Sequence, residues 1–198
     1  DVTSMVGDSN YVWIGSYYGI RQIDRTTRRE EPMGFEYLFY NHPVHDLDIN
    51  EYGVWIASRT GIYVYDKNNP QIRNALSLGI SYLDFPVSRV TSIYQHKNIL
   101  YFATNIGVIT FDLDEQIWDM LISAAEYKGL IVSDMFVAGK FCFIGTDQGL
   151  FRINLKSHRV REYNFDFIGS VNALEYMDKF IWMGTSEGLI RFKWRKDL

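Results

Sequence analysis

Five glycines in this sequence of 198 residues are each preceded by two residues that could bind a ligand. Tyrosine rings stack on flat apolar faces, and charged or amide side chains beside them form directional hydrogen bonds. A surface that combines both kinds of group suits a carbohydrate, a peptide or a partner protein. The pairs are Tyr17-Tyr18, Arg59-Thr60, Asn105-Ile106, Asp147-Gln148 and Ser186-Glu187.

Further aromatic and acidic residues lie in the segments between one of these motifs and the next, and Tyr82 and Asp84 are the candidates there. Loops often carry function on a fixed scaffold, so we expect these residues to share a binding surface with the pairs. The alternative is a set of solvated turns with ordinary exposed tyrosines. The predicted ligand- or partner-binding residues are Tyr17, Tyr18, Arg59, Tyr82, Asp84, Asp147 and Glu187.

The glycines that follow the pairs recur with a regular period. They stand at positions 19, 61, 107, 149 and 188, which are 42, 46, 42 and 39 residues apart. A period of this length is typical of repeat arrays and propellers. Each repeat also carries an aromatic residue six positions before the glycine and a valine 11 positions before the aromatic. The aromatic residues are Trp13, Trp55, Tyr101, Phe143 and Trp182, and the valines are Val2, Val44, Val90, Val132 and Val171.

Each repeat predicts a set of antiparallel strands. One strand begins at the valine, a second surrounds the aromatic residue, and a third follows the glycine. The second strand is apolar at successive positions, so we expect it to be covered on both faces. Fourth strands are predicted over residues 35–40, 72–78, 117–122 and 160–165, whereas the fifth repeat reaches residue 198 before any fourth strand.

The residues around the turn between the second and third strands are also of the same types in each repeat. Two residues after the aromatic stands a glycine or alanine, which suggests close approach by an aromatic side chain of the neighbouring repeat. The serine or threonine that follows suits hydrogen bonds to turn amides, and the glycine at the end of the turn suits a positive φ. An Asp or Asn after the third strand of the first four repeats should begin the next turn.

Radially arranged repeats of four antiparallel strands are the blades of a β-propeller. We therefore predict an all-β fold over residues 1–198, with blades at about 1–43, 44–89, 90–131, 132–170 and 171–198. We favour a segment of a larger ring, or a ring completed by another chain or copy, over a five-bladed ring that closes by itself. The sequence begins at Asp1 rather than methionine, so we expect a processed product or an excised segment.

In such a fold the first strand of each blade should line a central channel with polar groups. A carboxylate beside an imidazole suits several divalent metals. However, no metal-ligand spacing is present, and water in the channel would satisfy the same groups. We predict no metal and no cofactor. The predicted channel-lining residues are His45, Asp46, Asp134 and Asn172.

The combination of the valine, an aromatic-Ile-Gly-Thr run, a Gly-Leu pair and an Asp or Asn resembles the two-component-regulator propeller repeat. The copies at 143–152 and 182–191 match best, and the likeness covers essentially the whole sequence. The third copy departs most, with Tyr101, Ala103 and Val108. This resemblance implies an extracytoplasmic, periplasmic or cell-surface, sensor domain of a membrane-spanning hybrid kinase. The residues of the repeat motif are ones that pack strands against each other, so they give little information about the ligand.

Charge, hydropathy and the absence of known motifs argue against several classes of function. A net charge of -4 and a pI near 5.6 argue against nucleic-acid binding. No run approaches the roughly 20 apolar residues of a membrane span, so we expect no direct insertion. The one cysteine, Cys142, stands where other repeats have an aliphatic residue, and we expect it to be buried. No catalytic motif is present.

We therefore predict a non-catalytic binding module that acts as the extracytoplasmic input of a signalling protein. The alternative is a structural subunit whose open third strand, at residues 191–194, docks other subunits of a cell-surface or secretion complex. A hydrolase or lyase is a third hypothesis.

Overall fold

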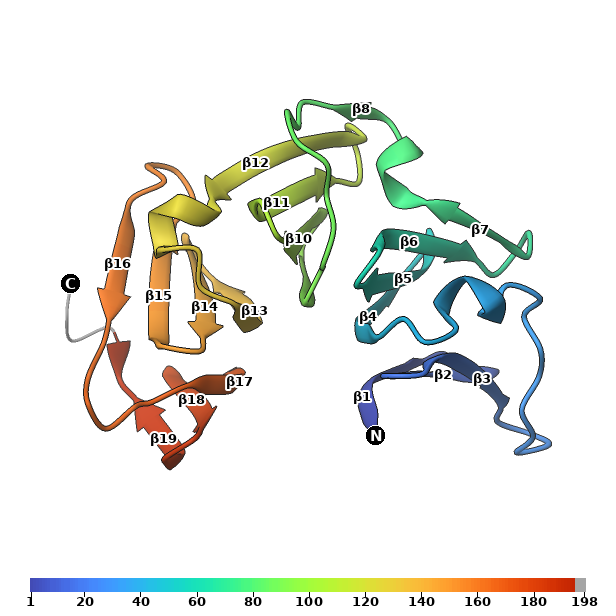
Figure 1. The fold of residues 1–198 in the computed structure, drawn as a ribbon, viewed down its shortest axis with the longest axis horizontal. Helices are drawn as coiled ribbons and strands as arrows, with labels where there is room; N and C mark the ends of the chain where they lie inside the picture. The colour runs from blue at the N-terminus through green and yellow to red at the C-terminus, as the bar shows by residue number, and fades with distance from the viewer. Residues whose placement is uncertain (195–198) are drawn as a thin grey trace. The chain divides into compact units, whose positions relative to one another are not determined.

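The computed structural model describes residues 1–194 and is built from five small sheets, one for each predicted repeat (Figure 1). The fold is all-β, and the sheets are five blades of a β-propeller. Two compact units divide the chain. The first holds residues 1–106 and 110–119, and the second holds residues 107–109 and those from 120 onward. The first and second blades lie in the first unit, and the fourth and fifth lie in the second.

Blade 1 has three antiparallel strands in the order β1-β2-β3. The fourth strand predicted over residues 35–40 is wrong, because this segment forms a 3-10 helix, η1 (Glu36–Phe39). Phe35 and Phe39 are both buried, whereas Tyr37, which a strand would place on the same face as the two phenylalanines, is exposed, as a helical turn requires. Gly34 precedes them with a φ of 83°, which interrupts an extended chain. The strands are β1 (Val2–Gly7), β2 (Tyr11–Ser16) and β3 (Gly19–Asp24).

Blade 2 has four antiparallel strands in the order β4-β5-β6-β7. The predicted fourth strand is shorter than expected, because Asn74 ends it and caps the 3-10 helix η2 (Ala75–Ser77) by accepting a hydrogen bond from Leu76 N–H (3.0 Å). The strands are β4 (Val44–Asn50), β5 (Gly53–Ser58), β6 (Gly61–Asp66) and β7 (Gln71–Asn74).

Blade 3 has five strands in the order β8-β12-β11-β10-β9. Its outermost strand, β8 (Ile80–Ser81), pairs in parallel with β12, although the sequence suggested that residues 80–81 belong to blade 2. A 3-10 helix, η3 (Ala124–Tyr127), follows β12. The remaining strands are β9 (Ser92–His96), β10 (Ile99–Ala103), β11 (Gly107–Asp112) and β12 (Ile117–Ser123).

Blades 4 and 5 are antiparallel sheets in the orders β13-β14-β15-β16 and β17-β18-β19. Blade 4 has the four strands predicted from its repeat. Blade 5 has three strands within the described residues, as its repeat predicts. The strands are β13 (Val132–Ala138), β14 (Phe141–Thr146), β15 (Gly149–Asn154), β16 (Val160–Tyr163), β17 (Val171–Met177), β18 (Phe180–Thr185) and β19 (Gly188–Phe192).

The second strand of a blade is the centre of its packing. Every residue of β5 and of β14 is buried, which confirms the prediction that these strands are covered on both faces. Cys142 lies in β14 and is fully buried, as predicted, and burial raises the pKa of its thiol to about 12. The core of blades 2 and 4 therefore forms around strands that are apolar up to their last residue, Ser58 in β5 and Thr146 in β14.

Blades 1 and 2, and likewise blades 4 and 5, approach each other at the small residue of the second strand. A Cβ atom placed on Gly15 would lie 2.8 Å from Val44 Cγ1, and one on Gly145 would lie 2.6 Å from Val171 Cγ1. The close neighbour is therefore the first valine of the next blade. The prediction of an aromatic side chain at this point is wrong. An aromatic ring is too large for the space, whereas a branched aliphatic side chain fills it.

Candidate ligand-binding surface

The turn between the second and third strands has the same geometry in each blade. In blade 1, Tyr18 N–H donates to Ser16 Oγ (3.1 Å), and the Ser16 hydroxyl donates to the carbonyl oxygen of Gly19 (3.1 Å). The counterpart amides at Thr60, Ile106, Gln148 and Glu187 bind the matching hydroxyls at 3.1–3.2 Å. The predicted turn chemistry is confirmed, and it holds the two residues before the glycine outward.

The first residue of each pair often serves the fold. Asp147 Oδ1 accepts a hydrogen bond from Ile131 N–H (3.2 Å), while Asp147 N–H donates to the carbonyl oxygen of Ile131 (3.3 Å). Asn105 makes the same reciprocal pair with Ser88. The Asp147 carboxylate therefore ties its turn to the loop that enters the blade. Glu187, the second residue of its pair, is exposed and accepts a hydrogen bond from Ser186 Oγ (3.3 Å).

Tyr18 lies beside two tyrosines that are not among the predicted binding residues. Tyr18, Tyr37 and Tyr40 are 74%, 73% and 73% exposed, and all three line one depression of about 530 Å³ on blade 1. We call this the tyrosine-lined depression. Tyr17 is the neighbour of Tyr18 in the same turn and is also exposed, but it does not line the depression.

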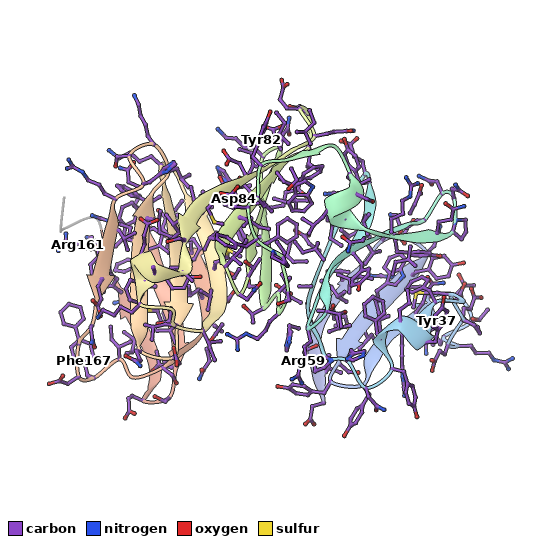
Figure 2. The ribbon with its side chains drawn as sticks, turned by 45° about the horizontal axis from the view of Figure 1, so that its top comes forward. Tyr37, Arg59, Tyr82, Asp84, Arg161 and Phe167 are labelled. Atoms are coloured by element: carbon purple, nitrogen blue, oxygen red, sulfur yellow. The ribbon has the colours of Figure 1, made fainter. Side chains whose placement is uncertain are left out.

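Helix η1 places the two additional tyrosines (Figure 2, where Tyr37 is labelled). Phe35 and Phe39 anchor this segment in the core, where Phe35 packs on Tyr65 (ring centroids 4.9 Å apart) and Phe39 on Tyr63 (5.2 Å). Between these anchors Leu38 packs partly against the core, and Tyr37 faces outward. A helical interpretation of the Phe35–Phe39 spacing would have found Tyr37 from the sequence.

Gly19 brings the turn and the helix together. Its φ is 122°, and a Cβ atom on it would lie 3.1 Å from the carbonyl oxygen of Phe39. The turn that carries Tyr18 therefore packs directly on the end of η1 that leads to Tyr40. Only a residue without a side chain suits both the backbone conformation and this contact.

Charged and amide groups complete the lining of the depression. Arg21 Nη1 lies 3.9 Å from Glu30 Oε2, and both side chains are more than half exposed, so this ion pair contributes little to stability. Glu36 accepts a hydrogen bond from Met33 N–H, and Asn41 adopts a left-handed conformation with φ of 60°. The wall thus offers both hydrogen-bond donors and acceptors next to the tyrosine rings.

The structure does not gather the other predicted binding residues at this depression. Arg59 lies in the turn between β5 and β6, where its carbonyl oxygen accepts from Arg89 N–H (2.9 Å). Tyr82 N–H donates to the carbonyl oxygen of Trp118 in β12 (3.1 Å). Figure 2 shows Arg59 at the lower edge of the first unit and Tyr82 and Asp84 in its upper part.

The predicted channel-lining carboxylates connect neighbouring blades. Asp46 Oδ1 accepts hydrogen bonds from Ser4 Oγ of blade 1 and from Leu47 N–H, and Asp46 Oδ2 accepts from Ile93 N–H of blade 3, all at 2.8 Å. Burial raises the pKa of Asp46, although these hydrogen bonds oppose the shift. Asp134 Oδ2 similarly accepts from Leu174 N–H of blade 5 (2.7 Å). Both carboxylates therefore have a packing role.

The other two predicted channel residues have no such role. Asn172 is exposed, and His45 is half-buried. Burial and the positive charges of Arg59 and Arg89 lower the pKa of His45, so its neutral form is favoured. Among residues 1–194, no group of three or more His, Cys, Asp or Glu side chains could hold a metal ion.

A second depression, of about 470 Å³, lies on blade 2 and was not predicted. Its polar groups are already used within the fold. Asp66 Oδ1 accepts from Asn68 N–H and Asn69 N–H (2.9 and 3.1 Å), Asp66 Oδ2 lies 3.8 Å from Arg73 Nη2, and Tyr52 Oη donates to the carbonyl oxygen of Leu113 (2.7 Å). The lining of the tyrosine-lined depression also contains such internal contacts, but it adds three mostly exposed aromatic rings, so it is the better candidate for binding.

No family model and no curated protein sequence matches this chain, but solved structures do. The extracellular domain of the putative one component system BT4673 from B. thetaiotaomicron has a TM-score of 0.76 and 15% identity, over 96% of this chain and 26% of that one. The shared property is the fold. The extracellular domain of the putative hybrid two component system BT3049 from the same organism has a TM-score of 0.67 and 18% identity, over 100% of this chain and 29% of that one.

PorZ, a surface component of the type-IX secretion system of Porphyromonas gingivalis, is also similar in fold. It has a TM-score of 0.68 and 14% identity, over 97% of this chain and 32% of that chain. This chain therefore spans less than a third of each of these three neighbours. Within the part that the structure describes, no helix is long and apolar enough to cross a membrane.

Proposed function

We propose that this chain is a non-catalytic binding propeller whose first blade recognises a carbohydrate. The observation that carries the proposal is the convergence of Tyr18, Tyr37 and Tyr40 on one depression while all three rings stay mostly exposed. Large exposed aromatic groups gathered in one place mark interaction sites more often than scattered ones do. The volume of about 530 Å³ also lies within the range of roughly 300–1,000 Å³ that is typical of small-molecule sites.

The chemistry of the lining suits a sugar. A pyranose ring has an apolar C–H face that stacks on a tyrosine, and its hydroxyl groups both donate and accept hydrogen bonds. Glu30 and Glu36 offer acceptors, Arg21 offers donors, and Asn41 offers both. A peptide with an aromatic or basic side chain would use some of the same groups, so peptides form the second arm of the test.

The setting we infer is the extracytoplasmic input of a signalling protein. The repeat motif and the fold shared with extracellular domains of one- and two-component systems support this inference. A ligand transmits a signal only when it binds two arrangements of the receptor with different affinity. The depression combines a turn of blade 1 with η1, so a ligand there would favour arrangements that keep Gly19 packed on Phe39.

Titration calorimetry with a panel of neutral, amino and acidic oligosaccharides, and with aromatic and basic peptides, tests this function. We expect a sugar to bind, and we expect Tyr37→Ala and Tyr40→Ala each to weaken its binding about tenfold. Tyr82→Ala is the matched control, because Tyr82 is 63% exposed but lies outside the depression. Arg59→Ala should also leave affinity unchanged. Equal losses of sugar affinity in Tyr37→Ala and Tyr82→Ala would contradict the proposed site.

A second candidate is a structural role in a cell-surface or secretion assembly, which the fold shared with PorZ favours. The sequence suggested docking along residues 191–194. However, Trp194 is buried, and its ring lies 5.4 Å from that of Phe141 and 5.1 Å from that of Phe143. An assembly role would therefore use a surface other than Trp194. Unaltered association after Phe192→Pro would count against strand addition at this edge.

A further inference from the structure

The depression of about 470 Å³ on blade 2 lies where the chain leaves that blade for blade 3. Between η2 and β8 the chain crosses to the outer edge of blade 3, where β8 pairs with β12 (Figure 1). Leu78 lies in this crossing, and its carbonyl oxygen accepts a hydrogen bond from Trp118 Nε1 (3.0 Å). We call this hollow the blade 2 depression. Its lining lies entirely within the first unit: Glu51, Tyr52, Val64, Asp66, Asn68, Arg73 and Leu78.

Opposite charges lie side by side in the blade 2 depression. Asp66 Oδ2 is 3.8 Å from Arg73 Nη2, and the Arg73 side chain is 47% exposed. An ion pair as exposed as this one contributes little to stability, so both groups keep the capacity to bind a ligand. Asp66 Oδ1 accepts hydrogen bonds from Asn68 N–H and Asn69 N–H (2.9 and 3.1 Å), which fixes the carboxylate at the end of β6.

Glu51 adds a second carboxylate from the turn between β4 and β5. It is exposed, and no hydrogen bond or ion pair with another of residues 1–194 occupies its side chain. The lining therefore has two carboxylates and one guanidinium, that of Arg73. A ligand ammonium group would find two acceptors here, and a ligand carboxylate would find the paired donors of the guanidinium.

The rest of the lining is largely apolar. Val64 is 5% exposed, and Leu78 is half-buried. Tyr52 Oη donates to the carbonyl oxygen of Leu113 (2.7 Å) and accepts from Gln116 Nε2 (3.4 Å), so the hydroxyl is occupied and the ring is what Tyr52 offers to a ligand. Such a surface favours an aliphatic group. The volume of about 470 Å³ also lies within the range of roughly 300–1,000 Å³ that is typical of small-molecule sites.

We propose that the blade 2 depression binds a free aliphatic α-amino acid. The ligand ammonium group lies against Glu51 and Asp66, its carboxylate against Arg73, and its side chain against the apolar part of the lining. The two charged groups of an α-amino acid are attached to one carbon, so they match carboxylate and guanidinium groups that are themselves close together. A ligand with only one charge would leave part of this arrangement unused. The site is separate from the tyrosine-lined depression, and the proposal does not depend on a sugar there.

NMR titration of the 198-residue chain, which also measures weak affinities, tests the proposal. The probes are L-leucine, L-isoleucine and L-valine, together with two derivatives of leucine that each lack one charge. Leucinamide keeps the ammonium group but has no carboxylate, and N-acetyl-leucine keeps the carboxylate but has no ammonium group. We expect at least one free amino acid to bind, and we expect each leucine derivative to bind about tenfold or more weakly than leucine.

Variants assign each ligand charge to its partner. Arg73→Gln should weaken leucine binding about tenfold but leave the affinity for leucinamide unchanged, because leucinamide has no carboxylate for Arg73. Glu51→Gln should weaken leucine binding and leave the affinity for N-acetyl-leucine unchanged. Arg25→Gln is the matched control, because Arg25 is an exposed arginine of the first unit outside the lining. Tyr37→Ala should bind leucine like the wild type, so a failure of the sugar site and a failure of this site are distinguishable.

Three results would overturn the proposal. The first is the absence of binding by all three free amino acids. The second is equal affinity for leucine and for either derivative, since the charges would then not be recognised. The third is leucine binding that Arg73→Gln and Glu51→Gln leave unchanged, or that Arg25→Gln weakens as much as Arg73→Gln does. Thermal melts check that each variant folds, and the exposure of the three substituted side chains predicts unchanged melting temperatures.

Discussion

Gly145 of blade 4 lies directly against Val171 of blade 5, so that a Cβ atom on Gly145 would approach Val171 Cγ1 to 2.6 Å. Real Cβ atoms essentially never come so close to another atom, so a side chain here must push the two blades apart. Gly145 thus sets the spacing between blades 4 and 5. The same relationship holds between Gly15 and Val44.

Gly145→Ala should lower the free energy of unfolding by about 1–3 kcal/mol, as overpacking of a core does. Gly184→Ala is the matched control, because it stands at the same position of the repeat and its nearest neighbour would be Ala173 Cβ at 3.6 Å. Urea denaturation of both variants measures the difference. Equal destabilisation by the two substitutions would show that the contact with Val171 does not set the blade spacing.

Gly19→Ala should disturb the tyrosine-lined depression. Both Gly19 and Gly188 have a φ near 120°, but only at Gly19 would a Cβ atom meet a neighbour, the carbonyl oxygen of Phe39 at 3.1 Å. Both alanine variants pay the cost of the strained backbone, roughly 1 kcal/mol or more. The additional destabilisation of Gly19→Ala in urea therefore reports the contact between the turn and η1. If the two variants lose equal stability, the packing of η1 on this turn is unimportant.

The stability of the first unit should depend on the ionisation of Asp48. Burial raises the pKa of this carboxyl above 3.8, and the charge of Asp46 adds to the shift, while a hydrogen bond from Ile49 N–H (2.7 Å) opposes it. The folded state therefore binds the proton more tightly than the unfolded state does. This contribution is present below pH 3.8 and is lost as the pH rises through the folded-state pKa.

Asp48→Asn tests this dependence, because the amide keeps an acceptor for Ile49 N–H and does not titrate. We expect the stability of the wild type relative to Asp48→Asn to fall as the pH is raised from 4 toward neutrality. Chemical denaturation of both proteins at several pH values measures the difference. Parallel stability curves for the two proteins would be inconsistent with a raised pKa at Asp48.

Cys142 should be inert in the folded protein. Its side chain is fully buried in β14, and burial raises its pKa to about 12, so the reactive thiolate is scarce at pH 8. A thiol reagent such as DTNB should label it only after denaturant is added. Rapid labelling of native protein would mean that blade 4 opens readily in solution.

The repeat allowed most of the fold to be predicted, because its residues act locally. Ser16 and Gly19 determine a turn through contacts within four residues, and the valines and aromatic residues repeat at fixed spacing. The prediction of secondary structure and of strand pairing was wrong where contacts between distant parts of the chain determine the conformation. Phe35 and Phe39 have the composition of a strand, yet they fill the space beside Tyr63 and Tyr65 as a helical turn. Strand β8 joins blade 3 through pairing with β12, which no local signal shows.

The candidate site was less predictable for the same reason. Tyr18 could be identified from its turn, but Tyr37 depends on η1, and η1 was predicted as a strand. Asp147 was predicted to bind a ligand, and the structure shows its carboxylate bonded to Ile131 N–H. Chemical type alone does not distinguish a carboxylate that holds a loop from one that faces a ligand.

The central claim is that the tyrosine-lined depression of blade 1 binds a carbohydrate. The most direct measurement is saturation-transfer NMR of the chain with the oligosaccharide panel, followed by a titration of the strongest binder into wild type, Tyr37→Ala and Tyr82→Ala. We predict transfer to the C–H protons of one sugar face, about tenfold weaker binding in Tyr37→Ala, and unchanged binding in Tyr82→Ala. Absence of transfer from every sugar, or equal affinity in all three proteins, would contradict the claim.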